Sequence, residues 1–185
     1  MEDYRINLNY AKALFLVASD MGQLDAVCSD MRLVNEVCVQ NHILETLFAN
    51  PVIRESKKVA ILNDLFAERI TSISLMFLTF VVRKRRAINL KGISNAFIEL
   101  YRDERNIVLS NLVTATEVDD SVKQAVCEAV NRQTGKTVEL TTKVDPSILG
   151  GFSVTYDNNM YDARISSQVA KLRKEFSKNV YESKL

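Results

Sequence analysis

Residues 150–162 read GGFSVTYDNNMYD and place signals for a strand, a turn and a helix start in immediate succession. Apolar and polar residues alternate over 152–157, which is the period of a half-buried strand. Asp157-Asn158-Asn159 then supplies residues that tolerate a left-handed backbone, so we expect a tight reversal there. Asp162 is expected to be the N-cap of a helix that continues to about Lys178. We interpret Gly150 and Gly151 as a close backbone approach at the strand start, where a Cβ would not fit.

The bulk composition indicates a globular chain with long regular elements. The chain has 185 residues, of which 47% are hydrophobic, and it contains only 5 glycines and 2 prolines. This length suits one domain or two small ones. The net charge of +1 is spread evenly, so the polybasic surface typical of nucleic-acid binding is missing.

The chain starts with acidic residues and no apolar segment, so we expect no secretory signal. The apolar run Ile73–Val82 is about half the length of a membrane-spanning helix, and we expect a protein that faces the cytoplasm.

The first half of the sequence has the 3.6-residue period of amphipathic helices. Six helices are predicted, at about residues 4–20, 24–38, 43–48, 56–66, 73–82 and 87–104. The helix at Ile73–Val82 is apolar nearly all round. It should therefore lie in the centre of the bundle or be partly covered by a partner.

Near residue 106 the period changes from 3.6 to 2. Strands are predicted at 107–118 and 137–144 with a helix at 122–133 between them, and the hairpin and final helix described above follow. The predicted fold is mainly α with a small α+β part. An N-terminal six-helix bundle occupies residues 1–106, and a C-terminal α+β domain with a short mixed sheet occupies residues 107–185.

No set of residues has the pattern of a catalytic or metal site. A single histidine, His42, excludes a multi-histidine metal centre. Cys38 lies four residues before it and could share its helix face as a nucleophile, but no third group orients the histidine, so packing is the preferred interpretation. Residues 134–137, TGKT, lack the first glycine of a phosphate-binding P-loop, since Val130 stands at its position. The three cysteines show no paired spacing and are expected to be reduced thiols. We expect no catalytic residue, no cofactor and no metal.

Several landmarks, taken together and in order, resemble one known family. They are YAKALF at residues 10–15, Asn50-Pro51, the run FIELYRDERNIVLSNLVTATEV at residues 97–118, and the opening stretch with Gln168-Val169 after it. This set is similar to the delta subunit of bacterial F-type ATP synthases, known in mitochondria as the oligomycin-sensitivity-conferring protein. The family usually has Gly-Ser after the aspartate at the last helix, where this chain has Ala163-Arg164. We therefore transfer no stalk contact of the family to residues 163–167.

The resemblance implies a non-catalytic stator subunit of a proton-translocating ATP synthase. Its N-terminal domain would bind the N-terminal segments of the alpha subunits, and its C-terminal domain would meet the ends of the b subunits. The protein would be peripheral at the inner or plasma membrane, on the cytoplasmic side, and would reach the membrane only through the complex. By match to the family motif, Tyr10 and Ala13 would form one wall of a groove and Phe80 the other. Plain core packing of these three residues is the alternative.

A second hypothesis is an unrelated helical adaptor module that binds another protein or RNA. It depends on the apolar helices and on the basic run Arg83–Arg86. That run is otherwise explained as a solvated helix end, where cations suit the negative end of the helix dipole. A steep salt dependence of binding would distinguish the RNA version.

Overall fold

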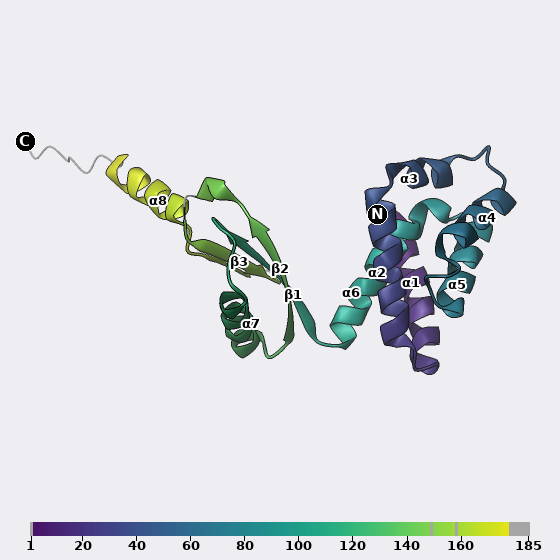
Figure 1. Ribbon diagram of the computed structural model, residues 1–185, viewed down its shortest axis with the longest axis horizontal. Coiled ribbons are helices and arrows are strands. Elements are labelled where there is room, and N and C mark those ends of the chain that lie inside the picture. The colour runs from purple at the N-terminus through teal and green to yellow at the C-terminus, as the bar shows by residue number, and fades with distance from the viewer. Residues whose placement is uncertain (1, 149, 158, 178–185) are drawn as a thin grey trace, which may run out of the picture. The chain divides into compact units, whose positions relative to one another are not determined.

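The computed structural model describes residues 2–148, 150–157 and 159–177. The chain divides into two compact units, Met1–Glu104 and Arg105–Leu185, and each has its own hydrophobic core. The first unit is helical and the second combines helices with a four-stranded mixed sheet (Figure 1). The predicted fold class is confirmed.

Six α-helices and one short 3-10 turn make up the described part of the N-terminal unit. They are α1 (Glu2–Asp20), α2 (Leu24–Gln40), α3 (His42–Ala49), α4 (Glu55–Phe66), α5 (Ser72–Arg83), η1 (Ala87–Asn89) and α6 (Leu90–Glu104). The sixth predicted helix is thus divided. Its first turn is a 3-10 turn, the tighter form that is frequent at helix ends.

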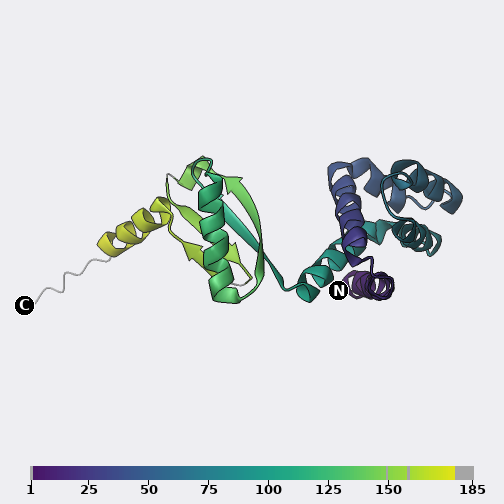
Figure 2. The same cartoon turned by 60° about the horizontal axis from the view of Figure 1, so that its bottom comes forward.

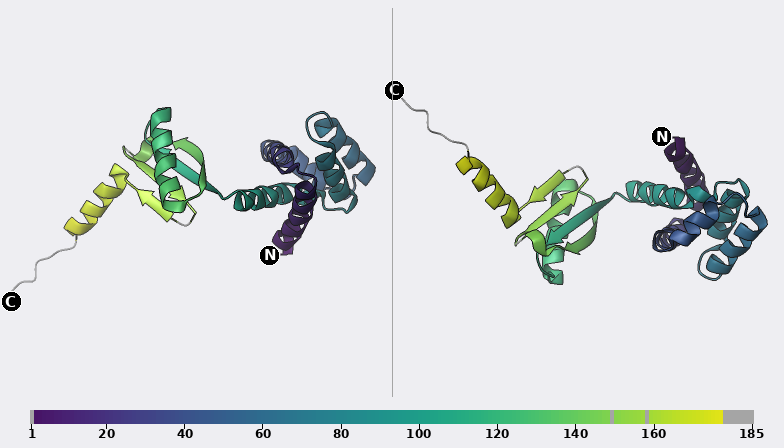
Figure 3. Two further views of the ribbon diagram at one scale, coloured as in Figure 1. Left: turned by 90° about the horizontal axis from the view of Figure 1, so that it is seen from below. Right: turned by 90° about the horizontal axis from the view of Figure 1, so that it is seen from above.

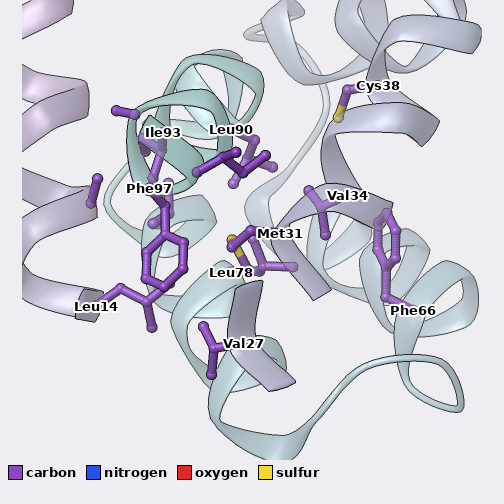
Figure 4. Packing of buried hydrophobic residues seen from close by; sticks show 14 of the residues in the cluster. Leu14, Val27, Met31, Val34, Cys38, Phe66, Leu78, Leu90, Ile93 and Phe97 are labelled. Atoms are coloured by element: carbon purple, nitrogen blue, oxygen red, sulfur yellow. The ribbon is translucent and has the colours of Figure 1, made fainter. Parts of the chain in front are cut away.

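The core of this unit forms where α1 and α2 pack against α6. Phe97, Met31, Leu62 and Leu78 are the largest of its fully buried side chains, and several of them meet in the close view of Figure 4. They come from four different helices, as expected when each helix of a bundle turns its apolar face inward.

The C-terminal unit is organised around strand β1 (Ile107–Thr114). The sheet order is β2-β1-β3-β4, with β2 at Thr137–Val144, β3 at Phe152–Tyr156 and β4 at Asn159–Asp162. Strand β1 is parallel to β2 and antiparallel to β3, and β3 is antiparallel to β4. Helix α7 (Asp120–Thr134) covers one face of the sheet, as Figure 2 shows, and buries Val130 against Val108, Leu112 and Val154.

The predicted strand at 107–118 ends four residues early, at Thr114. The Thr114 carbonyl accepts from the Asp145 N–H at 2.8 Å, and its hydroxyl donates to the Thr116 carbonyl at 2.7 Å. The first bond is the last step of the ladder between β1 and β2, and the second closes a turn in which the chain leaves the sheet. The sequence stays rich in Val and Thr after Thr114, but pairing with β2 ends there. The end of the strand could therefore not be predicted from composition.

The hairpin in the opening stretch is present, but the prediction that Asp162 is an N-cap is wrong. Asp162 pairs with Ser153 as the last residue of β4, and helix α8 (Ile165–Ser177) begins three residues later. The hairpin register therefore holds the Asp162 backbone in a strand. Asp157 has φ 47, in agreement with the predicted left-handed turn. Asn158 and the predicted helix end at Lys178 lie outside the described residues.

The glycine pair behaves as the sequence predicts. Gly151 has φ 78, and a Cβ there would collide with the carbonyl oxygen of Ala163. A Cβ on Gly150 would lie 2.8 Å from Cδ1 of Ile165. The loop between β4 and α8 thus packs directly on the start of β3, whereas the body of α8 extends away from the sheet (Figure 3).

Candidate partner-binding groove

An open apolar groove of about 560 Å³ runs between α1 and α5 in the N-terminal unit. From α1 it is lined by Asn9, Tyr10, Ala13, Leu14, Val17 and Met21, and from α5 by Ser72, Ile73, Met76, Phe77 and Phe80. The structure therefore brings the three predicted residues, Tyr10, Ala13 and Phe80, together in one groove. The rings of Tyr10 and Phe80 approach to 6.3 Å between centroids. Binding of a partner at these residues stays a prediction.

Helix α5 explains why this groove is apolar. Its inner face buries Leu78, Val81 and Val82, whereas Met76 is 73% exposed and Phe80 is 47% exposed. Side chains of this size are costly to leave in water, at about 25 cal/mol for each Å² of apolar surface. The sequence left two explanations for a helix that is apolar nearly all round: a place in the centre of the bundle, or cover by a partner. The inner face of α5 is buried in the bundle, and its exposed outer face fits a surface that a partner covers.

A buried carboxylate on α2 positions the start of the α5 wall. Asp30 is 7% exposed and accepts hydrogen bonds from the Thr71 N–H at 2.9 Å and from the Thr71 hydroxyl at 2.7 Å. Thr71 is the N-cap of α5, and its hydroxyl oxygen also accepts from the N–H of the fully buried Ser74. A carboxylate at a helix N-terminus is favoured by the helix dipole.

Sequence reasoning missed this link between α2 and α5. A signal was present, because Asp30 interrupts the apolar stripe of α2 directly before Met31, and Thr71 precedes a helix in the manner of a cap. The two residues are 41 positions apart, however, and no local pattern joins them.

The residues considered for chemistry do not form an active arrangement. His42 is exposed and its Nδ1 lies 3.1 Å from Glu45. Burial raises the pKa of the Cys38 thiol, which reduces the thiolate that a nucleophile requires. Gly135 has φ 68 and ends α7 as a left-handed C-cap, so TGKT is a helix end and not a phosphate loop. Among the described residues no cluster of potential ligands could hold a metal ion.

The C-terminal unit has a second apolar cleft, of about 700 Å³, between α7 and the sheet. Val122, Val126, Phe152 and Tyr161 contribute to its lining, and the rings of Phe152 and Tyr161 lie 5.9 Å apart. Helix α8 adds an exposed apolar stripe of Ile165, Val169, Leu172 and Phe176. This spacing places all four on one helix face, and Phe176 is 85% exposed.

A charged clamp fixes the loop that leads into α8. Asp162 accepts from the backbone N–H of Arg164 at 3.0 Å and from its guanidinium at 2.9 and 2.8 Å, and the Ser167 hydroxyl donates to it at 2.7 Å. The Arg164 guanidinium, followed by the Arg164 N–H and the Ser167 hydroxyl, holds the pKa of the Asp162 carboxyl well below its usual range.

Each of the two units has an exposed apolar groove, and the described residues include no cluster that could hold a metal ion. Comparison with known proteins names the family. The family model described as "ATP synthase delta (OSCP) subunit" matches residues 6–176, so the chain belongs to the ATP synthase delta (OSCP) subunit family.

Curated relatives agree with this assignment over nearly their whole length. The chain is 31% identical to ATP synthase subunit delta of Prochlorococcus marinus strain MIT 9301 over 170 residues, which cover 91% of this chain and 94% of that protein. It is 33% identical to the Lactobacillus johnsonii subunit over 171 residues, covering 92% and 93%. It is 30% identical to the Cytophaga hutchinsonii subunit over 180 residues, covering 97% and 98%.

The fold is also similar to a chain in the cryo-EM structure of the Toxoplasma gondii mitochondrial ATP synthase hexamer. The TM-score is 0.70 at 20% identity, and the match covers 92% of this chain and 97% of that one.

Membership in this family makes the protein a non-catalytic subunit of ATP synthase, a membrane-associated complex. Within the described ranges, no helix has both the length and the apolar character needed to cross a bilayer. As for the family, association with the membrane is indirect, through the complex. The family assignment does not favour the unrelated adaptor hypothesis.

Proposed function

We propose that this protein links the catalytic head of a proton-translocating ATP synthase to the peripheral stalk. In this proposal the groove between α1 and α5 binds the N-terminal segments of the alpha subunits as amphipathic helices. The C-terminal unit meets the ends of the b subunits. The link keeps the head from turning with the rotor, so that proton flow drives ATP synthesis. The protein acts at the inner or plasma membrane, peripherally and on the cytoplasmic side.

The apolar groove is the observation that supports the head contact best. It is open along its length, lined from two helices, and free of charged lining residues. A partner helix with residues at i, i+3, i+4 and i+7 would bury its apolar stripe there. Tyr10 and Phe80 at one end offer aromatic surface, the kind of side chain that contributes strongly to binding.

Calorimetry with the full chain and a peptide of the cognate alpha-subunit N-terminus tests this contact. Ala13→Asp should weaken binding more than about tenfold, because an unpaired carboxylate would be buried in an apolar groove. Ala60→Asp is the matched control, since Ala60 is exposed on α4 and does not line the groove. If the wild-type chain does not bind the peptide, or both variants weaken binding equally, the assignment of the groove is wrong.

For the b subunits, the exposed α8 stripe is the surface that we propose to test. Leu172→Asp should reduce co-purification of the b subunits with the full chain, because the stripe would lose its apolar continuity. Ala170→Asp makes a similar change on another side of the same exposed helix and should leave co-purification intact. Equal recovery of the b subunits with both variants would contradict a role of the stripe.

A further inference from the structure

A cavity of about 650 Å³ in the N-terminal unit is lined from α3, α4, α5 and η1, and it shares no lining residue with the groove between α1 and α5. Most of its polar lining comes from the start of α4, at Arg54, Glu55, Ser56 and Lys58. Another part of the lining, here called the apolar wall, consists of the exposed residues Pro51, Val52 and Ile88. The cavity therefore combines charged groups with an apolar surface.

The Lys58 side chain places a cation in this lining, and the fold buries it. Lys58 is 9% exposed, and its Nζ donates to the Phe48 carbonyl oxygen at 2.6 Å. This bond satisfies a carbonyl at the end of α3, but it uses one of the three N–H donors of the ammonium. The side chain has no further hydrogen bond and no ion pair among the described residues. A buried charge is costly unless it is paired, so the two remaining donors favour an anionic acceptor.

The first turn of α4 offers backbone donors to the same cavity. The N-cap residue Arg54 makes no side-chain cap hydrogen bond. Its carbonyl accepts from the N–H groups of Lys57 and Lys58, at 3.0 and 3.2 Å. The N–H groups of Glu55 and Ser56 have no acceptor within the described ranges. Because side chains tilt toward the N-terminus of a helix, Lys58 lies over this turn, and the helix end and the ammonium favour an anion together.

The charges of the cavity match a dianion. Glu55 is the acidic residue of its lining, and its carboxylate accepts from Nε of Arg85 at 2.7 Å, so these two charges offset each other. Arg54 is exposed and has no ion pair with a described residue. Lys58 and Arg54 are thus left as two uncompensated cations. A phosphate monoester carries a charge of about −1.5 to −2 at pH 7 and three strong acceptor oxygens, whereas a carboxylate carries a single charge.

We propose that this cavity binds a phosphate monoester. Its phosphoryl oxygens accept hydrogen bonds from the Lys58 ammonium and from the N–H groups of Glu55 and Ser56, with the Arg54 guanidinium as the second cation. Its organic group covers the apolar wall. The site does not depend on the proposed function of the groove between α1 and α5, because the two surfaces have separate linings.

Amide spectra of the isotope-labelled full chain locate the anion. Inorganic phosphate is titrated at low salt, and the backbone amide signals of Glu55 and Ser56 should shift most, because their N–H groups gain an acceptor. The basic run Arg83–Arg86 could also attract phosphate without a built site. If the largest shifts fall on that run, or if no signal shifts, the proposed site is overturned.

Substitutions in the cavity measure what binds the phosphate. Lys58→Met should weaken binding of inorganic phosphate about tenfold or more, since it removes buried, charge-assisted hydrogen bonds. Arg54→Gln should weaken it about threefold, because an exposed charge contributes less. Lys57→Gln is the matched control, since Lys57 is exposed on α4 and does not line the cavity.

Lys58→Met also removes the donor to the Phe48 carbonyl, so its fold is checked by circular dichroism. Arg54→Gln changes an exposed side chain and decides the question where Lys58→Met does not fold. Equal weakening by Arg54→Gln and Lys57→Gln would show a general charge effect and would overturn the site.

Two further probes test the class of ligand by calorimetry. Phenyl phosphate should bind about threefold to tenfold more tightly than inorganic phosphate, because its ring covers the apolar wall. Val52→Ser should remove that advantage, since Val52 is the most exposed large side chain of the wall. Benzoate has the same ring with a single charge and should bind more weakly than phenyl phosphate. Equal binding of benzoate and phenyl phosphate, or of phenyl phosphate and inorganic phosphate, would overturn the assignment to a phosphate monoester.

Vesicles distinguish the two sources of such a group, a lipid headgroup and a free phosphate monoester. The full chain is sedimented with vesicles of phosphatidylcholine, with and without phosphatidic acid, whose headgroup is a phosphate monoester. Sedimentation that requires phosphatidic acid and falls in Arg54→Gln but not in Lys57→Gln supports the site with a lipid as the source. Sedimentation that falls equally in both variants contradicts a lipid in this cavity. Binding of phenyl phosphate without any sedimentation supports the site with a free monoester as the source.

Discussion

At the scale of single residues, the C-terminal unit depends on two positions, one that requires glycine for its backbone conformation and one that requires a carboxylate for its hydrogen bonds. Gly151 combines a positive φ with a close approach of the Ala163 carbonyl. Asp162 gathers three donor groups from Arg164 and Ser167. Both residues act on the loop between β4 and α8, so this short loop determines where α8 begins and which way it leaves the sheet.

Gly151→Ala should destabilise the C-terminal unit more than Gly135→Ala. Both glycines have similar positive φ angles, 78 and 68, so both substitutions should cost about 1 kcal/mol for the backbone conformation. Only Gly151 also faces backbone atoms, whereas an added Cβ at Gly135 meets nothing within 4 Å. Urea unfolding of both variants should show the larger loss for Gly151→Ala, by a further 1 kcal/mol or more, about the cost of local overpacking. Equal losses would mean that the loop can move aside.

Asp162 should make the free energy of unfolding of the C-terminal unit depend on pH in the acid range. Its pKa in the folded protein is lowered, so the carboxylate stabilises the fold fully above the unfolded pKa of about 3.9. That contribution is lost as the pH falls from about 4 through the folded pKa. Urea unfolding at pH 7 and pH 3 should therefore show a difference between wild type and Asp162→Asn that is smaller at pH 3. A difference that does not change with pH would contradict the clamp.

At the scale of elements, the sequence predicts helices well and their junctions less well. The stripes of α1, α2 and α6 are set by local periodicity, and burial follows them directly. Asp162 was misassigned because its place depends on pairing with Ser153 across a hairpin, which no residue type encodes alone. The groove was predicted from two helices, but the contact between the Tyr10 and Phe80 rings depends on how those helices pack, which local periodicity does not show.

The link between α2 and α5 gives a prediction at this scale. Asp30→Ala leaves the Thr71 N–H and hydroxyl without their acceptor and should cost about 1–3 kcal/mol of stability. Because Thr71 caps the helix that forms one wall of the groove, the same change should weaken binding of the alpha peptide under conditions where the variant is folded. Leu62→Val, a conservative core change away from the groove lining, is the control. Equal peptide affinities for both variants would show that Asp30 contributes to stability only.

At the scale of the whole molecule, two cores imply two unfolding transitions. The N-terminal core draws on helices α1 to α6, whereas among the described residues the core cluster of the C-terminal unit contains four buried hydrophobic residues, Val108, Leu112, Val130 and Val154. Less buried apolar surface means less stabilisation, so the C-terminal unit should unfold at the lower temperature.

Scanning calorimetry of Leu62→Ala tests this division. The substitution should lower the N-terminal transition by the equivalent of about 2–5 kcal/mol, since Leu62 is fully buried. The C-terminal transition should keep its temperature. Gly151→Ala should lower the C-terminal transition and leave the N-terminal transition unchanged. A single transition that shifts as a whole in either variant would show that the two units unfold together.

The order of strands in the sheet has a mechanical consequence. The chain enters the C-terminal unit at the start of β1 and leaves the sheet at the end of β4, and these two strands run in the same direction with β3 between them. A pull on both ends of the sheet therefore slides β1 and β4 in opposite directions along their axes. The hydrogen bonds of both ladders lie across that direction and must yield together, not one after another. Tension that enters from the helical unit and leaves toward α8 is thus borne in shear, the geometry in which a small sheet resists being pulled apart.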